Sequence, residues 1–462
     1  MPGFFSNLLQ SLRGRRKDMR FLCHRLLSER GEASQTAIAQ EIISAYQSMK
    51  TEQRPAFFEI LEREFSPDPT RVRAAALAYE RAPSNATLSA LSGAVEAPRQ
   101  ELIRRINTAP HGTETLVALR AHLLSLSRGD GPTRNGPDFE ALDSDLRHLF
   151  RSWFNRGFLK LERISWRTSA RILEKLIRYE SVHEINGWPD LRRRLEADRR
   201  CFAFFHPALA EEPIIFVEVA LSKGLAGDLE PLLDLNAPVL DPEQADTAIF
   251  YSINNCQVGL RNVPFGNFLI KQVVTELASE LPNIKSYSTL SPLPLFAQAL
   301  HDNENEHGFT RHRLARLLAD YSRDLSSIAG RRDTVDVFFK LLHDPLAHRE
   351  VLAEPLERLA LAYLTRARRG GKLYDPVATF HLSNGARLER IYSFGNLRPY
   401  GIEASYGVTV NYRYLPEELE ENHERFVRGG QIRVPNGLFR EHKVVAAAWD
   451  PPAEKSLREK RR

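Results

Sequence analysis

The first third of the chain repeats apolar residues with the period of an α-helix. Apolar side chains recur every three or four positions within residues 36–46, 55–65 and 115–126, so each segment has one apolar face. Strand-like alternation does not interrupt this pattern before about residue 150. The pattern predicts an all-α helical bundle over residues 1–152.

After residue 153 the pattern changes to short runs rich in β-branched and aromatic residues, separated by helical stretches. Such runs are typical of buried strands, and alternation with helices indicates an α/β or α+β domain over residues 153–462. The predicted strands cover residues 201–205, 214–221, 247–253, 284–290 and 407–414. The predicted helices cover residues 169–179 and 268–278 and much of 309–369.

Two glycine-containing turns complete this interpretation. Asn384-Gly385 lies between strand-like runs within residues 377–394, which predicts a two-residue hairpin turn with His381 on the first strand. Gly370-Gly371 lies among basic residues after a helical pattern, which predicts the C-terminal end of a helix.

Composition excludes several classes of protein. The 462 residues are 42% hydrophobic and 27% charged, as in ordinary globular proteins. The apolar runs, such as residues 214–217, are too short to span a bilayer, so we expect no membrane span. A net charge of +5 suits a small polyanion as well as nucleic acid. Because basic and aromatic residues are not interleaved around the tryptophans, we expect no nucleic-acid partner.

Cysteine usage and the N-terminus bear on the compartment. The three cysteines are widely spaced, which argues against a disulfide framework, and no Cys-x-x-Cys or His-x-x-x-His pair suggests a structural metal site. Residues 1–17 are basic and free of acids, as in a mitochondrial transit peptide. Asp18 follows at once and serines are few, so we favour a basic lead-in to the first helix and a cytoplasmic location over the mitochondrial matrix.

A strand–loop–helix segment over residues 247–276 is a candidate anion site. The free N–H groups and the positive dipole end of a helix N-terminus suit a pyrophosphate. Arg261 would add a charge, and Gly266 would let a phosphate approach the backbone. The glycines fit neither the dinucleotide-binding nor the Walker pattern, so an ordinary β–α turn with an Asn N-cap is the alternative.

Ser291 and His381 are the candidate chemical groups. Ser291 follows a strand-like run and is flanked by Pro292 and Pro294, which restrict its backbone. It lacks the Gly-x-Ser-x-Gly setting of a hydrolase nucleophile, so it is a positioning hydroxyl or simply a capping one. His381 is a proton donor with a pKa near working pH, or a half-exposed hairpin histidine.

Long runs of the chain resemble malonyl-CoA decarboxylases, over most of residues 150–415 and in order. The matching runs are residues 204–209, 212–221, 248–257, 265–274, 289–294, 375–386 and 410–414. The resemblance implies an N-terminal helical domain joined to a mixed-sheet catalytic domain of the GNAT acyltransferase type. It also implies that Ser291 and His381 form the catalytic pair and that Tyr414 lies in the site.

The same resemblance assigns acyl-CoA binding to the loop before the helix predicted over residues 268–278 and to one residue near His381. These residues are Arg261, Asn262, Val263, Pro264, Phe265, Gly266, Asn267 and Asn384. Pro264 departs from the family pattern, because animal members have a glutamate there. A carboxylate at that position is therefore not required, or its task is done otherwise.

The implied activity is that of a carboxy-lyase, which converts malonyl-CoA to acetyl-CoA and carbon dioxide. The thioester can hold the electrons as an enolate, which a histidine would protonate, so no metal or organic cofactor is expected. The alternatives are an acyl-CoA acyltransferase of the GNAT type and a non-catalytic acyl-CoA-binding regulator. The apolar helical faces and the family resemblance indicate a homo-oligomer, a dimer or a tetramer.

Overall fold

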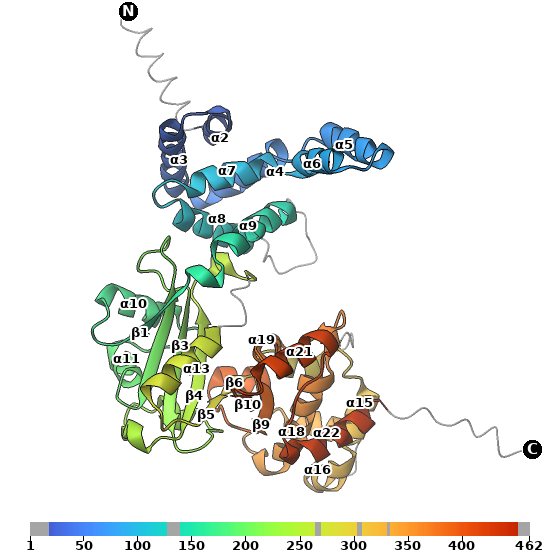
Figure 1. Ribbon diagram of the computed structural model, residues 1–462. Coiled ribbons are helices and arrows are strands. Elements are labelled where there is room, and N and C mark those ends of the chain that lie inside the picture. The colour runs from blue at the N-terminus through green and yellow to red at the C-terminus, as the bar shows by residue number, and fades with distance from the viewer. Residues whose placement is uncertain (1–17, 127–138, 264–268, 303–306, 330–332, 451–462) are drawn as a thin grey trace, which may run out of the picture. The chain divides into compact units, whose positions relative to one another are not determined.

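The computed structural model describes residues 18–126, 139–263, 269–302, 307–329 and 333–450 (Figure 1). The basic stretch of residues 1–17 and the predicted acyl-CoA-binding residues Pro264, Phe265, Gly266 and Asn267 lie outside the described residues. Among the helices described, none combines the length and the apolar character that crossing a bilayer requires.

The chain forms two compact units whose segments alternate along the sequence. Unit 1 comprises Met1–Lys160, Phe204–Ile215 and Asn255–Gly266. Unit 2 comprises Leu161–Ala203, Phe216–Asn254 and Asn267–Arg462. The single boundary expected after residue 152 is a different division of the chain, and it stays a prediction.

Unit 1 is helical, as the apolar periodicity predicts. Ile38, Ile42, Phe58 and Leu61 are at most 2% exposed, so the predicted apolar faces form its core. The helices are α2 (Met19–Ser28), α3 (Glu32–Gln47), α4 (Arg54–Glu64), α5 (Pro69–Arg81), α6 (Asn85–Val95), α7 (Pro98–Asn107), α8 (Gly112–Leu126) and α9 (Glu140–Trp153), with the 3₁₀ turns η1 (Thr51–Gln53), η2 (Arg156–Phe158) and η4 (Val258–Leu260).

A mixed sheet runs through the second part of the chain, in the order β1-β2-β3-β4-β5-β10-β6, and β9 pairs with β10. Its strands are β1 (Lys160–Ile164), β2 (Arg199–Phe205), β3 (Ile215–Ser222), β4 (Thr247–Asn255), β5 (Ser286–Thr289), β6 (Ser291–Pro292), β9 (Arg387–Tyr392) and β10 (Thr409–Tyr414). β5 is parallel to β4 and antiparallel to β10. The predicted combination of a helical N-terminal region and a mixed-sheet domain is confirmed, although β1 was not predicted.

Unit 2 also contains many helices. They are α10 (Ala170–Tyr179), α11 (Trp188–Arg194), α12 (Glu230–Leu233), α13 (Leu269–Glu280), α14 (Phe296–His301), α15 (Arg311–Leu317), α16 (Ser322–Ala329), α17 (Thr334–Leu341), α18 (Arg349–Arg366), α19 (Pro376–Ser383), α20 (Pro399–Ser405), α21 (Leu419–Gly429) and α22 (Asn436–Trp449). The predicted helices near 169–179 and 268–278 are therefore confirmed as α10 and α13.

Both predicted glycine turns are wrong, and each has the structure expected of the other. His381 lies on helix α19, and Gly385, with a φ of 83°, follows the C-cap Asn384. Gly370 and Gly371, with φ of 56° and 78°, instead connect the two-stranded hairpin of β7 (Arg368–Arg369) and β8 (Lys372–Leu373). Positive φ suits a helix C-terminus and a tight hairpin alike, so glycine alone does not distinguish them.

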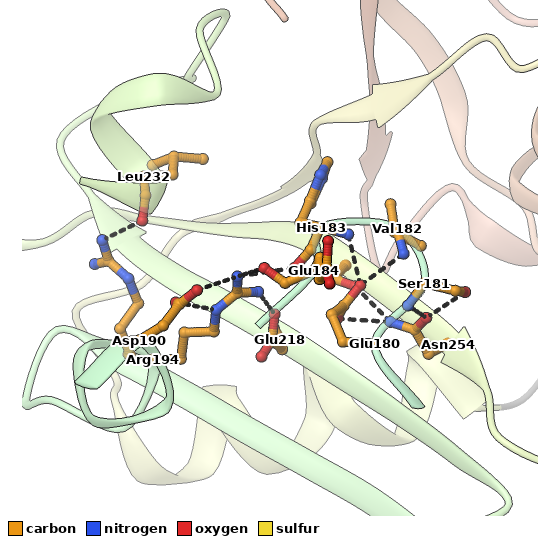
Figure 2. A network of polar contacts seen from close by, with 12 residues as sticks. Glu180, Ser181, Val182, His183, Glu184, Asp190, Arg194, Glu218, Leu232 and Asn254 are labelled. Atoms are coloured by element: carbon orange, nitrogen blue, oxygen red, sulfur yellow. Dashed lines mark hydrogen bonds and ion pairs between the residues drawn. The ribbon is translucent and has the colours of Figure 1, made fainter. Parts of the chain in front are cut away.

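A buried polar network fixes the segment between α10 and α11 to the sheet (Figure 2). Arg194 contacts Asp190 at 2.8 Å and Glu218 of β3 at 2.7 Å, and it donates to the carbonyl of His183. Glu180 accepts from Ser252 and Asn254 of β4, each at 2.7 Å. Because buried charges are costly unless paired, these contacts hold β3 and β4 in a fixed position relative to this segment.

Candidate active site

Ser291 lies where the sheet changes partners. β5 ends at Thr289, Leu290 interrupts the pairing, and β6 begins at Ser291, opposite Val410 of β10. The side chain is only 5% exposed, so its hydroxyl must find a partner inside the protein. The prediction that a strand-like run leads to this serine is confirmed.

His381 comes from the last turns of α19. Asp375 caps the start of this helix by accepting from the N–H of Ala378 at 2.7 Å, and Pro376 occupies the first turn. Tyr363 donates to the second oxygen of Asp375 at 2.8 Å. Burial raises the pKa of Asp375 to about 6. Since His381 is 3% exposed, the alternative of a half-exposed histidine is wrong.

The three predicted catalytic residues are in direct contact. His381 Nε2 lies 3.1 Å from Ser291 Oγ, and His381 Nδ1 lies 2.7 Å from the hydroxyl of Tyr414. Ser291 Oγ donates to Thr289 Oγ1 at 2.9 Å. We call these four residues, Tyr414, His381, Ser291 and Thr289, the relay.

Protonation of the ring follows from its surroundings. Burial lowers the pKa of His381 to about 3, so the imidazole is neutral at neutral pH, and the expectation of a near-neutral pKa is wrong. Burial also raises the pKa of Tyr414 well above its ordinary value. Because Ser291 donates to Thr289, its lone pairs accept from His381 Nε2–H, which leaves Nδ1 to accept from Tyr414.

Two residues of the site escaped the sequence interpretation. Thr289 is fully buried, and its Oγ1 accepts from the N–H of Tyr412 at 3.0 Å as well as from Ser291. The ring of Tyr412 stacks on His381, with centroids 4.7 Å apart and planes inclined by 21°. Sequence spacing could have indicated both residues. Thr289 lies two positions before Ser291, and Tyr412 lies two positions before Tyr414 on the strand β10.

The predicted acyl-CoA-binding residues fall in different surroundings. Asn384 donates from Nδ2 to the carbonyl of Phe380 at 2.7 Å, so its side chain caps α19. Arg261, Asn262 and Val263 follow η4 in unit 1, where Arg261 and Asn262 are exposed and Val263 is buried. Their role in binding stays a prediction.

The described residues also bear on the expectation that the protein holds no metal. These residues contain no group of three or more His, Cys, Asp or Glu side chains placed to hold an ion. The relay instead combines one imidazole with hydroxyl groups, which are suited to hold and move a proton.

A buried imidazole on α19 lies between two hydroxyls carried by β6 and β10, an arrangement that is able to hold and move a proton. Comparison with known families shows which enzyme family the chain resembles. Residues 157–450 match the family model of the malonyl-CoA decarboxylase C-terminal domain, and residues 65–154 match that of the malonyl-CoA decarboxylase N-terminal domain.

Individual malonyl-CoA decarboxylases are similar to the chain in sequence and in structure. The chain is 34% identical to the mitochondrial malonyl-CoA decarboxylase of Anser anser anser, over 72% of this chain and 67% of that protein. The crystal structure of malonyl-CoA decarboxylase from Rhodopseudomonas palustris is 41% identical and superposes with a TM-score of 0.81, covering 93% of this chain and 99% of that one. The structure from Agrobacterium vitis is also 41% identical, with a TM-score of 0.78 over 92% and 99%. The chain belongs to the malonyl-CoA decarboxylase family.

Proposed function

We propose that this protein decarboxylates malonyl-CoA to acetyl-CoA and carbon dioxide. Family membership supports the choice of substrate, and the contact between His381 Nε2 and Ser291 Oγ at 3.1 Å is the observation that supports a proton-transfer site. Decarboxylation breaks the bond between the carboxylate and the α-carbon, and its electrons form the thioester enolate. One proton must then reach the α-carbon.

In this proposal His381 supplies that proton. The resting ring is neutral because burial lowers its pKa to about 3. A malonyl carboxylate bound beside the ring raises the pKa again, so the imidazole takes up a solvent proton when substrate binds. Loss of neutral carbon dioxide moves that negative charge onto the thioester enolate, and the imidazolium then protonates the α-carbon and returns to the neutral ring.

The two partners of the ring are compatible with both of its protonation states. Ser291 and Tyr414 carry hydroxyls, which can accept from an imidazolium or donate to a neutral imidazole. Ser291 would also orient the malonyl carboxylate, so that the breaking bond lies perpendicular to the thioester plane. Neither role requires Ser291 to be acylated.

Acyl-CoA binding is proposed for the loop that begins at Arg261. Arg261 directly follows η4 in the segment whose sequence pattern predicts a pyrophosphate site. Arg261 is exposed and offers a cation to the phosphates of coenzyme A.

Incubation with malonyl-CoA alone tests the proposal. We expect acetyl-CoA and carbon dioxide in equal amounts, without added metal, cofactor or amine. Turnover that appears only with an amine acceptor would favour an acyltransferase, and binding without turnover would favour a regulator. Calorimetry with an amide analogue of malonyl-CoA, in buffers of different ionisation enthalpy, should show proton uptake near neutral pH. His381→Gln should abolish that uptake.

We also propose that residues 1–152 form an oligomerisation domain and residues 153–462 a catalytic domain. Supporting this, α5 and α6 expose the apolar side chains Leu77, Leu88 and Val95 by 43%, 46% and 49%. Light scattering on the full chain should give the mass of a dimer or a tetramer. The double variant Leu77→Glu with Leu88→Glu should lower that mass, and an unchanged mass would place the contact elsewhere.

A further inference from the structure

The turn that leads into the proposed acyl-CoA loop is held by its backbone. We call residues 258–263 the η4 turn. A Cβ atom on Gly259 would lie 1.9 Å from the carbonyl oxygen of Val117, so this turn packs directly on helix α8. Asn262 follows with a φ of 62°, a conformation that non-glycine residues rarely adopt. Such a conformation persists only where its surroundings hold it.

The side chain of Arg120 holds the η4 turn in this conformation. Arg120 of α8 is 1% exposed and donates from one terminal nitrogen to the carbonyls of Gly259 at 2.7 Å and Arg261 at 2.8 Å. Its Nε donates to Asp143 of α9 at 2.8 Å, and the second terminal nitrogen also faces this carboxylate. The guanidinium therefore fixes two carbonyls of the η4 turn and is itself fixed by a carboxylate.

We propose that Arg120 is a positioning residue that sets the affinity of this protein for the coenzyme A part of its substrate. By holding the carbonyl of Arg261, it fixes the point from which the Arg261 side chain extends. A turn whose backbone is fixed before binding loses less entropy when its exposed cation meets the phosphates. This inference rests on the proposed acyl-CoA function, and it gives the helical unit a direct part in substrate recognition.

Arg120→Met tests the assignment because methionine keeps an unbranched apolar stem and removes every donor. Arg120→Lys keeps the charge facing Asp143, but its single ammonium cannot reproduce the planar fork. Asp143→Asn leaves the donors of Arg120 in place and weakens their anchor. Arg105 is the matched control, because it also lies in unit 1 and donates to backbone carbonyls, those of Leu26 and Glu29.

The measurement compares two substrates. Malonyl-pantetheine carries the reacting group without the nucleotide, so only malonyl-CoA should depend on the η4 turn and Arg261. We expect Arg120→Met to raise the KM for malonyl-CoA about tenfold, because charged donors are lost from two carbonyls. The kcat should stay within about twofold, and kcat/KM for malonyl-pantetheine should be unchanged. Arg120→Lys and Asp143→Asn should fall between wild type and Arg120→Met, and Arg105→Met should leave the ratio of the two substrates unchanged.

Two outcomes would overturn the inference. One is an unchanged KM for malonyl-CoA, and the other is an equal loss with both substrates, which would reveal general destabilisation. Titration with coenzyme A itself keeps the question separate from turnover. If wild type binds coenzyme A without decarboxylating malonyl-CoA, the proposed reaction fails, and about tenfold weaker binding by Arg120→Met still supports the inference. If wild type binds no coenzyme A, both proposals fail.

Discussion

The relay and the η4 turn differ in whether their functional side chains are buried or exposed. In the relay the side chains of Ser291 and His381 are at most 5% exposed, and the atoms that would do chemistry contact one another. In the η4 turn two backbone carbonyls are anchored by Arg120, whereas the side chains of Arg261 and Asn262 are exposed. Proton transfer requires fixed atoms in a dry site, whereas a flexible polyanion requires accessible charge on a fixed backbone. Variants can test whether this division holds.

The largest expected effect is loss of the relay itself. Ser291→Ala or His381→Ala should lower kcat by about 10²- to 10⁴-fold, because a positioned acid or hydroxyl is removed at the reacting carbon. Steady-state kinetics with malonyl-CoA measures this loss. His423→Ala is the control, since His423 contacts the carbonyl of Ser383 at the end of the same helix but lies outside the relay. Wild-type rates in either relay variant would remove these residues from the mechanism.

The next effect concerns the η4 turn. Gly259→Ala places a methyl group against the carbonyl of Val117, so the turn must move away from α8. We expect the KM for malonyl-CoA to rise about 10- to 100-fold with a smaller change in kcat, together with a lower melting temperature. Gly93→Ala in α6 is the control, because a Cβ there meets nothing within 4 Å. If Gly259→Ala lowered kcat and left the KM unchanged, the η4 turn would act on the reaction step and not on substrate binding, and the contrast with the relay would be wrong.

A smaller effect is expected at the outer end of the relay. Tyr414→Phe removes the partner of His381 Nδ1 and leaves that buried nitrogen without its hydrogen bond, so kcat should fall about tenfold while KM changes little. Tyr406→Phe is the matched control, since Tyr406 and His301 form another tyrosine–histidine contact, at 2.6 Å, outside the relay. Equal losses in both variants would mean that Tyr414 acts through stability alone.

The smallest effect is on stability against pH. His381 has a pKa of about 3 in the folded protein and about 6.5 when unfolded, so the unfolded state binds the extra proton between these values. The free energy of unfolding should therefore fall as pH drops below 6.5, by about 2 kcal/mol at pH 5 from this residue. Urea unfolding at pH 7.5 and 5 should show a smaller fall for His381→Gln. An identical fall in both proteins would show that the ring is not the titrating group.

Much of the architecture could be predicted from periodicity, because helices and buried strands repeat apolar residues over many positions. The turns around His381 could not be predicted in the same way. Asn-Gly was interpreted as a hairpin, although Asp375, Pro376 and Gly385 together form the ordinary start and end signals of a helix. Gly370-Gly371 was interpreted as a helix end and is a hairpin turn.

The candidate site shows a similar limit. Resemblance indicated Ser291, His381 and Tyr414, and the structure brings the three together. Thr289 and Tyr412 were missed because their importance comes from contacts between β5, β10 and α19, which no local pattern encodes. The low pKa of His381 was missed for the same reason, since burial is a property of the folded chain.

The contact between Arg120 and the η4 turn also sets an order of events during synthesis. Its acceptors at Gly259 and Arg261 lie 139 and 141 residues further along the chain. At ribosomal rates of about 5–20 residues per second, Arg120 is synthesised roughly 7–30 s before these carbonyls exist. Until residues 259–261 are made, the guanidinium lacks these two acceptors, and Asp143 is the partner that is already present. Chaperones that bind the part of α8 around Arg120 would therefore do so before the growing chain reaches residue 259.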